Sequence, residues 1–214
     1  MPAPRFWLIA GPNGAGKSTL VRGEPLRDVL PAIYPLNADE QTIQVLQRRG
    51  YGRFQDAPRL VLLDAFIEAS DAVFGEVVAR LKRGEAVCVE TVLSTDKYCP
   101  VVNQVAAAGG YFALIYVALR SPQLAAERVA NRVRAGGHDV PADKITARWH
   151  RSFEWLPWFA ARASVFWVFD NSDATPELPP LLIARGVEGK IQVLKPDAIP
   201  EITHALGSLP RLPN

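Results

Sequence analysis

Residues 11–18 read Gly-Pro-Asn-Gly-Ala-Gly-Lys-Ser and fit the pattern G-x-x-x-x-G-K-[ST] at every fixed position. The apolar run at 5–10 before them suits a buried strand, and the residues from 17 onward can open a helix. Three glycines let the backbone turn its N–H groups toward phosphate oxygens, and the helix N-terminus adds a positive dipole end. The stretch therefore predicts a nucleoside triphosphate site.

Each side chain of this loop has a chemical reason to be there. Lys17 can reach the β- and γ-phosphates of ATP, and the Ser18 hydroxyl can ligate Mg²⁺. After the last predicted core strand comes Asp170-Asn171-Ser172, where Asn171 can lie beside the base or simply form a turn. The residues expected to contact the nucleotide are Gly11, Pro12, Asn13, Gly14, Ala15, Gly16, Lys17, Ser18, Thr19 and Asn171.

The composition of the chain excludes several classes of protein. Its 214 residues suit one domain, or one domain with a small lid. A formal net charge of +2 gives no basic field for nucleic acid or an anionic membrane, and no stretch is long and apolar enough to span one. Two cysteines without a C-x-x-C and three scattered histidines predict a reduced, cytoplasmic protein without a histidine metal site.

Strand and helix patterns alternate along the chain, which predicts an α/β fold: a mostly parallel sheet of the P-loop NTPase type, flanked by helices. The helix at 59–83 carries an apolar stripe that includes Leu63 and Ile67, and Pro157 is expected to kink or stop the helix that begins near Pro141. Strands are expected over 5–10, 34–38, 86–89, 111–119 and 165–169, and helices over 17–30, 41–47, 59–83, 101–108, 122–134 and 141–155.

The C-terminal part has a different character. A proline-rich connector leads to runs 181–185 and 190–195 around Gly-Val-Glu-Gly, which predict a β-hairpin, and 198–209 predicts a weak helix. We expect a P-loop core over 1–172, with a helical lid at about 121–156. Residues 173–214 would be an appendage of the same domain.

Two acids follow predicted strands, at the sheet edge where ligands of open α/β sheets bind. Glu90 ends the strand at 86–89 and could hold Mg²⁺ through water, contact the substrate, or be a solvated carboxylate. Asp39 follows the second strand. It could take the proton from an attacking hydroxyl, or it could cap the helix at 41–47.

Two arginine-bearing helices joined by Gly136-Gly137 form a candidate lid. Its arginines could neutralise charge that develops during phosphoryl transfer, or they could be ordinary solvated residues. We favour a functional role for Arg132 and Arg148 over one for Arg128, Arg134 and Arg151. The aromatic residues Trp149 and Phe153 lie at helical spacing and are expected to pack in the core.

The order of these motifs over about residues 5–172 resembles the zeta toxin group of P-loop kinases, which are related to UDP-N-acetylglucosamine kinase. The resemblance rests on the loop at 11–19, Asn-Ala-Asp at 37–39, Glu-Thr at 90–91, Arg-Val-Arg-Ala-Gly-Gly-His-Asp-Val-Pro at 132–141, the arginines of 145–152 and Asp-Asn-Ser at 170–172. One departure concerns position 42, near which several of these toxins carry a basic residue and this chain has Glu40-Gln41-Thr42.

The resemblance implies a role for each matched residue. Asp39 would be the base that activates a sugar hydroxyl, Glu90 with Thr91 would contact the acceptor, and Arg132 and Arg148 would engage the phosphates. It also implies an ATP-dependent kinase for a nucleotide-activated amino sugar such as UDP-N-acetylglucosamine, and a small antitoxin as a possible partner. Two other readings stay open, namely a kinase for another metabolite or an antibiotic, and a non-catalytic ATP-gated binding module.

Overall fold

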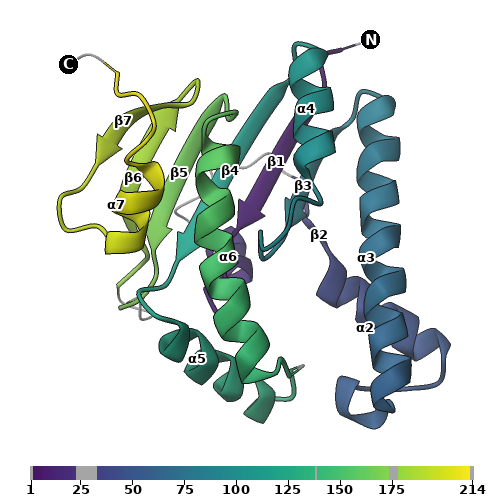
Figure 1. Ribbon diagram of the computed structural model, residues 1–214. Helices are drawn as coiled ribbons and strands as arrows, with labels where there is room; N and C mark the ends of the chain where they lie inside the picture. Colours follow the sequence, from purple (N-terminus) through teal and green to yellow (C-terminus); the bar gives the residue numbers. More distant parts are fainter. Residues whose placement is uncertain (1, 23–32, 138, 174–177, 213–214) are drawn as a thin grey trace.

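The computed structural model describes residues 2–22, 33–137, 139–173 and 178–212. Within these ranges the chain forms one seven-stranded sheet in the order β2-β3-β1-β4-β5-β6-β7 (Figure 1). Strands β1 to β5 pair in parallel, β6 runs antiparallel to β5, and β7 runs antiparallel to β6. The predicted α/β class and the C-terminal hairpin are therefore confirmed. The strands are β1 (Arg5–Ala10), β2 (Leu36–Asn37), β3 (Ala86–Glu90), β4 (Tyr111–Ala118), β5 (Val165–Asp170), β6 (Leu181–Val187) and β7 (Lys190–Leu194).

Strand β1 lies at the centre of the parallel part of the sheet. It pairs with β3 on one side and β4 on the other, and its residues Phe6–Ala10 are buried. Near-continuous apolar runs of this kind are typical of parallel strands that are covered on both faces. Because β3 and β4 leave β1 on opposite sides, the connections diverge at its carboxyl end, where open α/β sheets bind their ligands.

The helices cover the sheet and also extend beyond it. Figure 1 shows α4, α6 and α7 in front of the sheet, while α2 with the first half of α3, and α5 with the first half of α6, project past the carboxyl ends of the parallel strands. The helices are α1 (Lys17–Arg22), α2 (Ala38–Arg48), the short 3₁₀ helix η2 (Phe54–Asp56), α3 (Arg59–Lys82), α4 (Cys99–Ala107), α5 (Pro122–Arg134), α6 (Ala142–Ala160) and α7 (Pro200–Leu206).

The predicted apolar stripe of α3 is wrong in its first half. Leu63 and Ile67 belong to that stripe but are 41% and 62% exposed. This half of α3 lies beyond the sheet and packs on α2, with the small residues Ala65 and Ala69 fully buried at the contact. The second half does follow the prediction, since Val73, Val77 and Leu81 are buried in the main core.

Two other boundaries differ from the sequence-based expectation. Helix α6 does not stop at Pro157 but continues to Ala160, because buried side chains on both sides of the proline, among them Phe153 and Phe159, anchor it. Helix α2 begins at Ala38 rather than Gln41, so the strand before it shortens to two residues. The expected extension of α1 to residue 30 and part of the proline-rich connector lie outside the described residues.

Trp149 and Phe153 are buried, as predicted.

None of the helices in the described part of the chain combines the length and the apolarity needed to cross a membrane.

Candidate active site

The phosphate loop connects β1 to α1 and contains three glycines with positive φ. The shape of the loop requires glycine most clearly at two of them. A Cβ on Gly11 would lie 2.1 Å from the carbonyl oxygen of Val117, and one on Gly16 would lie 2.4 Å from Nδ2 of Asn171. The loop is therefore pressed between its own strand neighbour β4 and the turn after β5.

Lys17 is the cation of this loop and is only 7% exposed. Its Nζ donates hydrogen bonds to the carbonyl oxygens of Gly11, at 2.9 Å, and Pro12, at 3.1 Å, which hold the ammonium group across the loop. Burial lowers the pKa of Lys17, while the negative charges of Glu90 and Asp39 raise it and the positive charge of Arg132 lowers it. Glu90, Asp39 and Arg132 therefore lie close enough to Lys17 to act on it electrostatically.

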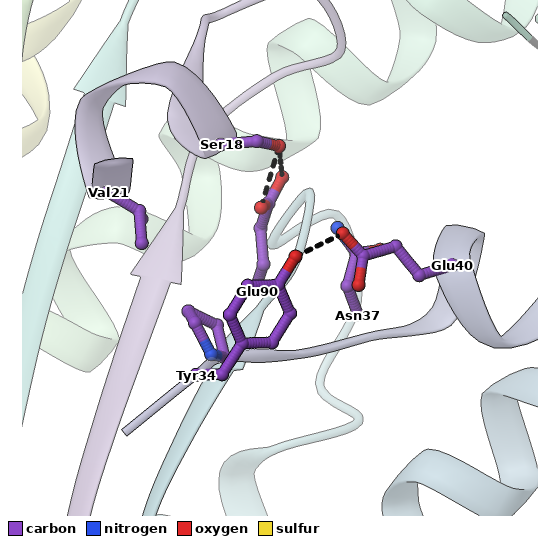
Figure 2. Close-up of a pocket in the computed structure, with 7 residues that line it drawn as sticks. Ser18, Val21, Tyr34, Asn37, Glu40 and Glu90 are labelled. Atoms are coloured by element: carbon purple, nitrogen blue, oxygen red, sulfur yellow. Dashed lines mark hydrogen bonds between the residues drawn. The ribbon is translucent and has the colours of Figure 1, made fainter. Parts of the chain in front are cut away.

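Ser18 and Glu90 form the contact between the loop and β3. The Ser18 hydroxyl donates to the Glu90 carboxylate, with its Oγ 3.0 Å from Oε1 and 2.9 Å from Oε2 (Figure 2). Parallel pairing of β1 with β3 makes the contact possible, because it sets Glu90 opposite Ile9 at the end of the strand. A hydroxyl and a carboxylate at the phosphate loop are oxygen ligands that suit Mg²⁺, which needs few protein ligands beside phosphate oxygens and water. The described residues hold no cluster of three or more His, Cys, Asp or Glu for a protein-only metal site.

A pocket opens beside this contact. Figure 2 shows Tyr34 and Glu40 on the far side of it from Ser18, with the Tyr34 hydroxyl donating to Oε1 of Glu40 at 2.7 Å. No local sequence pattern identifies Tyr34 or Glu40 as pocket residues, because their place depends on the path of the chain from β2 into α2. The pocket is lined by Ser18, Val21, Tyr34, Pro35, Asn37, Glu40 and Glu90.

Asp39 lies in the first turn of α2, and it is not the helix cap. Asn37 is the N-cap, and its Oδ1 accepts a hydrogen bond from the backbone N–H of Asp39 at 2.8 Å. The alternative that Asp39 serves to cap the helix is therefore wrong. The Asn-x-Asp spacing before an amphipathic helix is the signal that could have identified Asn37 as the cap.

The two favoured arginines come from the α5–α6 pair. Arg132 lies in the last turn of α5, and its charge lowers the pKa of Lys17. Arg148 lies on α6 and is half-buried; burial lowers its pKa, while the carboxylate of Asp39 raises it and Arg151 lowers it. Arg148 thus acts on Asp39 and Arg132 acts on Lys17, so both arginines lie near the residues of the candidate site.

The other lid arginines occupy different places. The guanidinium of Arg128 donates through Nη2 to the carbonyl oxygen of Ser172 at 3.0 Å, next to the phosphate loop. Arg134 is exposed and donates to the side chain of Asn131 on its own helix. Arg151 is exposed on α6. Arg134 and Arg151 therefore fit the solvated helix face.

Three further residues were predicted to contact ligands. Asn171 is buried, and its Nδ2 donates to the carbonyl oxygen of Ala15 at 2.7 Å. Thr91 extends β3 by one hydrogen bond from its N–H to the carbonyl of Ile9, at 2.9 Å, and is half-buried beside Glu90. Thr19 is exposed on the first turn of α1.

Comparisons with known proteins identify the fold. No protein-family model and no curated protein matches the sequence. Among solved structures, the native AvrRxo1-ORF1:ORF2 complex gives a TM-score of 0.67 at 13% identity, over 94% of this chain and 63% of that one. The same complex with ATP gives 0.66 at 11% identity, over 90% and 61%. The PezAT toxin–antitoxin system of Streptococcus pneumoniae gives 0.50 at 14% identity, over 85% and 71%.

At these identities the likeness concerns the fold alone. A putative kinase from Chloroflexus aurantiacus matches at a TM-score of 0.50 and 19% identity, over 85% of this chain and 81% of that one. The chain spans less than two thirds of the AvrRxo1 chains that it matches. The resemblance predicted from the motifs is thus supported at the level of the fold, which this chain shares with a toxin–antitoxin system and a putative kinase.

Proposed function

We propose that the protein is an ATP-dependent small-molecule kinase that transfers the γ-phosphoryl group to a hydroxyl. The observation that carries the proposal is the setting of Lys17. The charges of Glu90, Asp39 and Arg132, from β3, α2 and α5, all act on its ammonium group. A phosphate-loop lysine with acidic and arginine side chains near it supports phosphoryl transfer, in which the cations would stabilise phosphate charge and a carboxylate would take the acceptor proton.

The transfer step uses these residues in definite roles. The Asp39 carboxylate takes the proton of the acceptor hydroxyl as its oxygen bonds to the γ-phosphorus, while the bond from that phosphorus to the β–γ bridging oxygen breaks and ADP leaves. Lys17, Arg132 and Arg148 stabilise the charge that spreads over the phosphoryl oxygens. Ser18 would ligate Mg²⁺ and Glu90 would orient that hydroxyl, and the bound ion would supply positive charge to offset part of the charge on the phosphoryl oxygens.

We propose a nucleotide-activated amino sugar such as UDP-N-acetylglucosamine as the acceptor. The support is the set of motifs shared with the zeta toxin group, together with the likeness of fold to the PezAT system. Near position 42 several of these toxins carry a basic residue, whereas this chain holds a buried threonine at 42. Its Oγ1 donates to the Ala38 carbonyl at 2.7 Å. A nucleotide-sugar phosphate would therefore be bound by other residues in this chain.

The same likeness of fold supports the proposal of a protein partner. The matched AvrRxo1 structures are complexes between the proteins of two open reading frames, ORF1 and ORF2, and PezAT is a toxin–antitoxin system. We propose that a small antitoxin covers the nucleotide site. Such a partner would have to compete with ATP, so its addition should raise the apparent Kd for ATP.

The test is a transfer reaction read by mass spectrometry. The protein is incubated with Mg·ATP and, separately, UDP-N-acetylglucosamine, UDP-glucose and free N-acetylglucosamine. We expect one phosphorylated nucleotide sugar and an equal amount of ADP, with neither product from the Lys17→Ala variant. Formation of ADP without a phosphorylated sugar would contradict the proposal that a nucleotide sugar is the acceptor. ATP binding with no turnover on any compound would favour the ATP-gated module.

A further inference from the structure

We propose that Asn171 is a positioning residue that holds the phosphate loop in its binding shape from outside, rather than a contact to the nucleotide base. This inference rests on the proposed nucleotide site, and it assigns a role to the turn after β5. It predicts that Asn171 supports the binding of any triphosphate, whatever base the triphosphate carries.

The carbonyl groups of the phosphate loop accept hydrogen bonds from side-chain donors. A phosphate loop binds anions because its N–H groups point inward, so its carbonyls must find donors elsewhere. Lys17 Nζ donates to the Gly11 and Pro12 carbonyls, and the Leu20 N–H donates to Gly16 at 2.9 Å. For the Ala15 carbonyl the donor is the side-chain amide of Asn171, at 2.7 Å.

The Asn171 side chain packs closely against the backbone of the phosphate loop. Asn171 is 7% exposed, and a Cβ on Gly16 would lie 2.4 Å from its Nδ2, so the amide lies directly against the loop backbone. A side chain in that position fills the space behind the loop. Loss of the amide would release the Ala15 carbonyl and leave a gap there at the same time.

Asn171 is itself held firmly by the turn around it. Its backbone N–H donates to the Ala118 carbonyl at 3.1 Å, which continues the pairing of β5 with β4. The Ser172 hydroxyl accepts from the Arg120 N–H at 2.9 Å, and the Ser172 carbonyl accepts from Arg128 at 3.0 Å. The turn thus links β4, α5 and the phosphate loop, and Asn171 makes its bond to the loop.

The experiment compares the affinities of three ligands, Mg·ATP, Mg·GTP and Mg-tripolyphosphate, for the wild type and for Asn171→Ala. We expect all three affinities to fall by the same factor, about tenfold, which corresponds to the net worth of one hydrogen bond. Ser172→Ala is the matched control: it removes the neighbouring side chain and its bond to the Arg120 N–H, and it should leave the three affinities within about twofold of wild type. The melting temperature without ligand is recorded for each variant.

Each outcome decides between the roles. A loss confined to ATP would show that Asn171 reads the base, and a lower melting temperature with unchanged affinities would show a merely structural residue; both overturn the proposal. Should Asn171→Ala fail to fold, Asn171→Asp keeps the shape and removes the donor. Its loss should persist at high salt, whereas a loss that disappears there would reflect charge repulsion and overturn the proposal. A wild-type protein that binds none of the three ligands would overturn the proposed function as well.

Discussion

Glu90 is the residue whose role changes most when the fold is known. From the sequence alone Glu90 could contact either the acceptor or the metal ion, because both would bind beyond the end of β3. In the structure both of its carboxylate oxygens lie within 3.0 Å of the Ser18 hydroxyl. Because Ser18 is the expected Mg²⁺ ligand, this contact favours the metal side for Glu90.

Glu90→Gln should therefore raise the Mg²⁺ concentration needed for half-maximal ATP binding by about tenfold or more, as for other groups that orient a metal ligand. Calorimetric titration of ATP at a series of Mg²⁺ concentrations measures it. Glu40→Gln, on the Tyr34 side of the same pocket, is the control and should leave the Mg²⁺ requirement unchanged. A raised acceptor KM at an unchanged Mg²⁺ requirement would assign Glu90 to the acceptor instead.

The sequence predicts such residues in part. The loop residues and Lys17 follow from a motif whose geometry is local, so the backbone turn and the lysine follow from the sequence alone. Asp39 and Asn37 differ by two positions, and which of them caps α2 depends on where the helix begins. Tyr34 and Glu40 approach the site only because the chain passes from β2 into α2 beside it, and no local pattern reports that path.

At the scale of elements, the α5–α6 pair is expected to act as one unit on the transferred phosphoryl group. Arg132→Ala and Arg148→Ala should each lower kcat more than ATP affinity, because both act on charge that develops in the transition state. The double variant should lose less than the product of the two single losses. Steady-state kinetics of the four proteins measure this. The exposed Arg151→Ala is the control, with a kcat expected within about twofold of wild type.

If the effects of the two arginine substitutions on kcat were strictly independent, or if the melting temperature fell without a kinetic effect, neither arginine would have the proposed shared role in catalysis.

Elements were predicted well where hydrophobic patterns and caps are local. Strand β1 and helix α5 have the predicted bounds, and Ser121 caps α5 through a hydrogen bond from the Leu124 N–H. The errors have tertiary causes. Leu63 and Ile67 are exposed because half of α3 leaves the sheet, and α6 passes Pro157 because packing on the sheet outweighs one lost backbone hydrogen bond.

At the scale of the whole molecule, buried ionisable groups predict how stability depends on pH. Burial raises the pKa of the Cys88 thiol to about 12, and it also raises the pKa of the Tyr98 and Tyr116 hydroxyls. Below pH 9 the thiol is protonated in both states, so its contribution is constant. Above pH 9 the unfolded chain loses this proton first, and the free energy of unfolding falls.

Urea unfolding at pH 7 to 11 tests this expectation. The midpoint should be flat to about pH 8.5 and then decline. Cys88→Ala should flatten the decline between pH 9 and 10, where one such group changes the free energy of unfolding by up to about 1.4 kcal/mol per pH unit. An equally steep decline in Cys88→Ala and wild type between pH 9 and 10 would mean that the Cys88 thiol ionises as readily in the folded state as in the unfolded one.

The central claim is that Asp39 is the base of a phosphoryl transfer, and one comparison tests it most directly. Asp39→Asn keeps the size of the side chain and leaves the Asn37 cap in place. Its Kd for Mg·ATP and its rate of transfer to the accepted sugar are measured beside those of the wild type. We predict an affinity within a few fold of wild type and a transfer rate lower by about 10²–10⁴, the usual worth of a positioned base. An unaltered transfer rate would contradict the account.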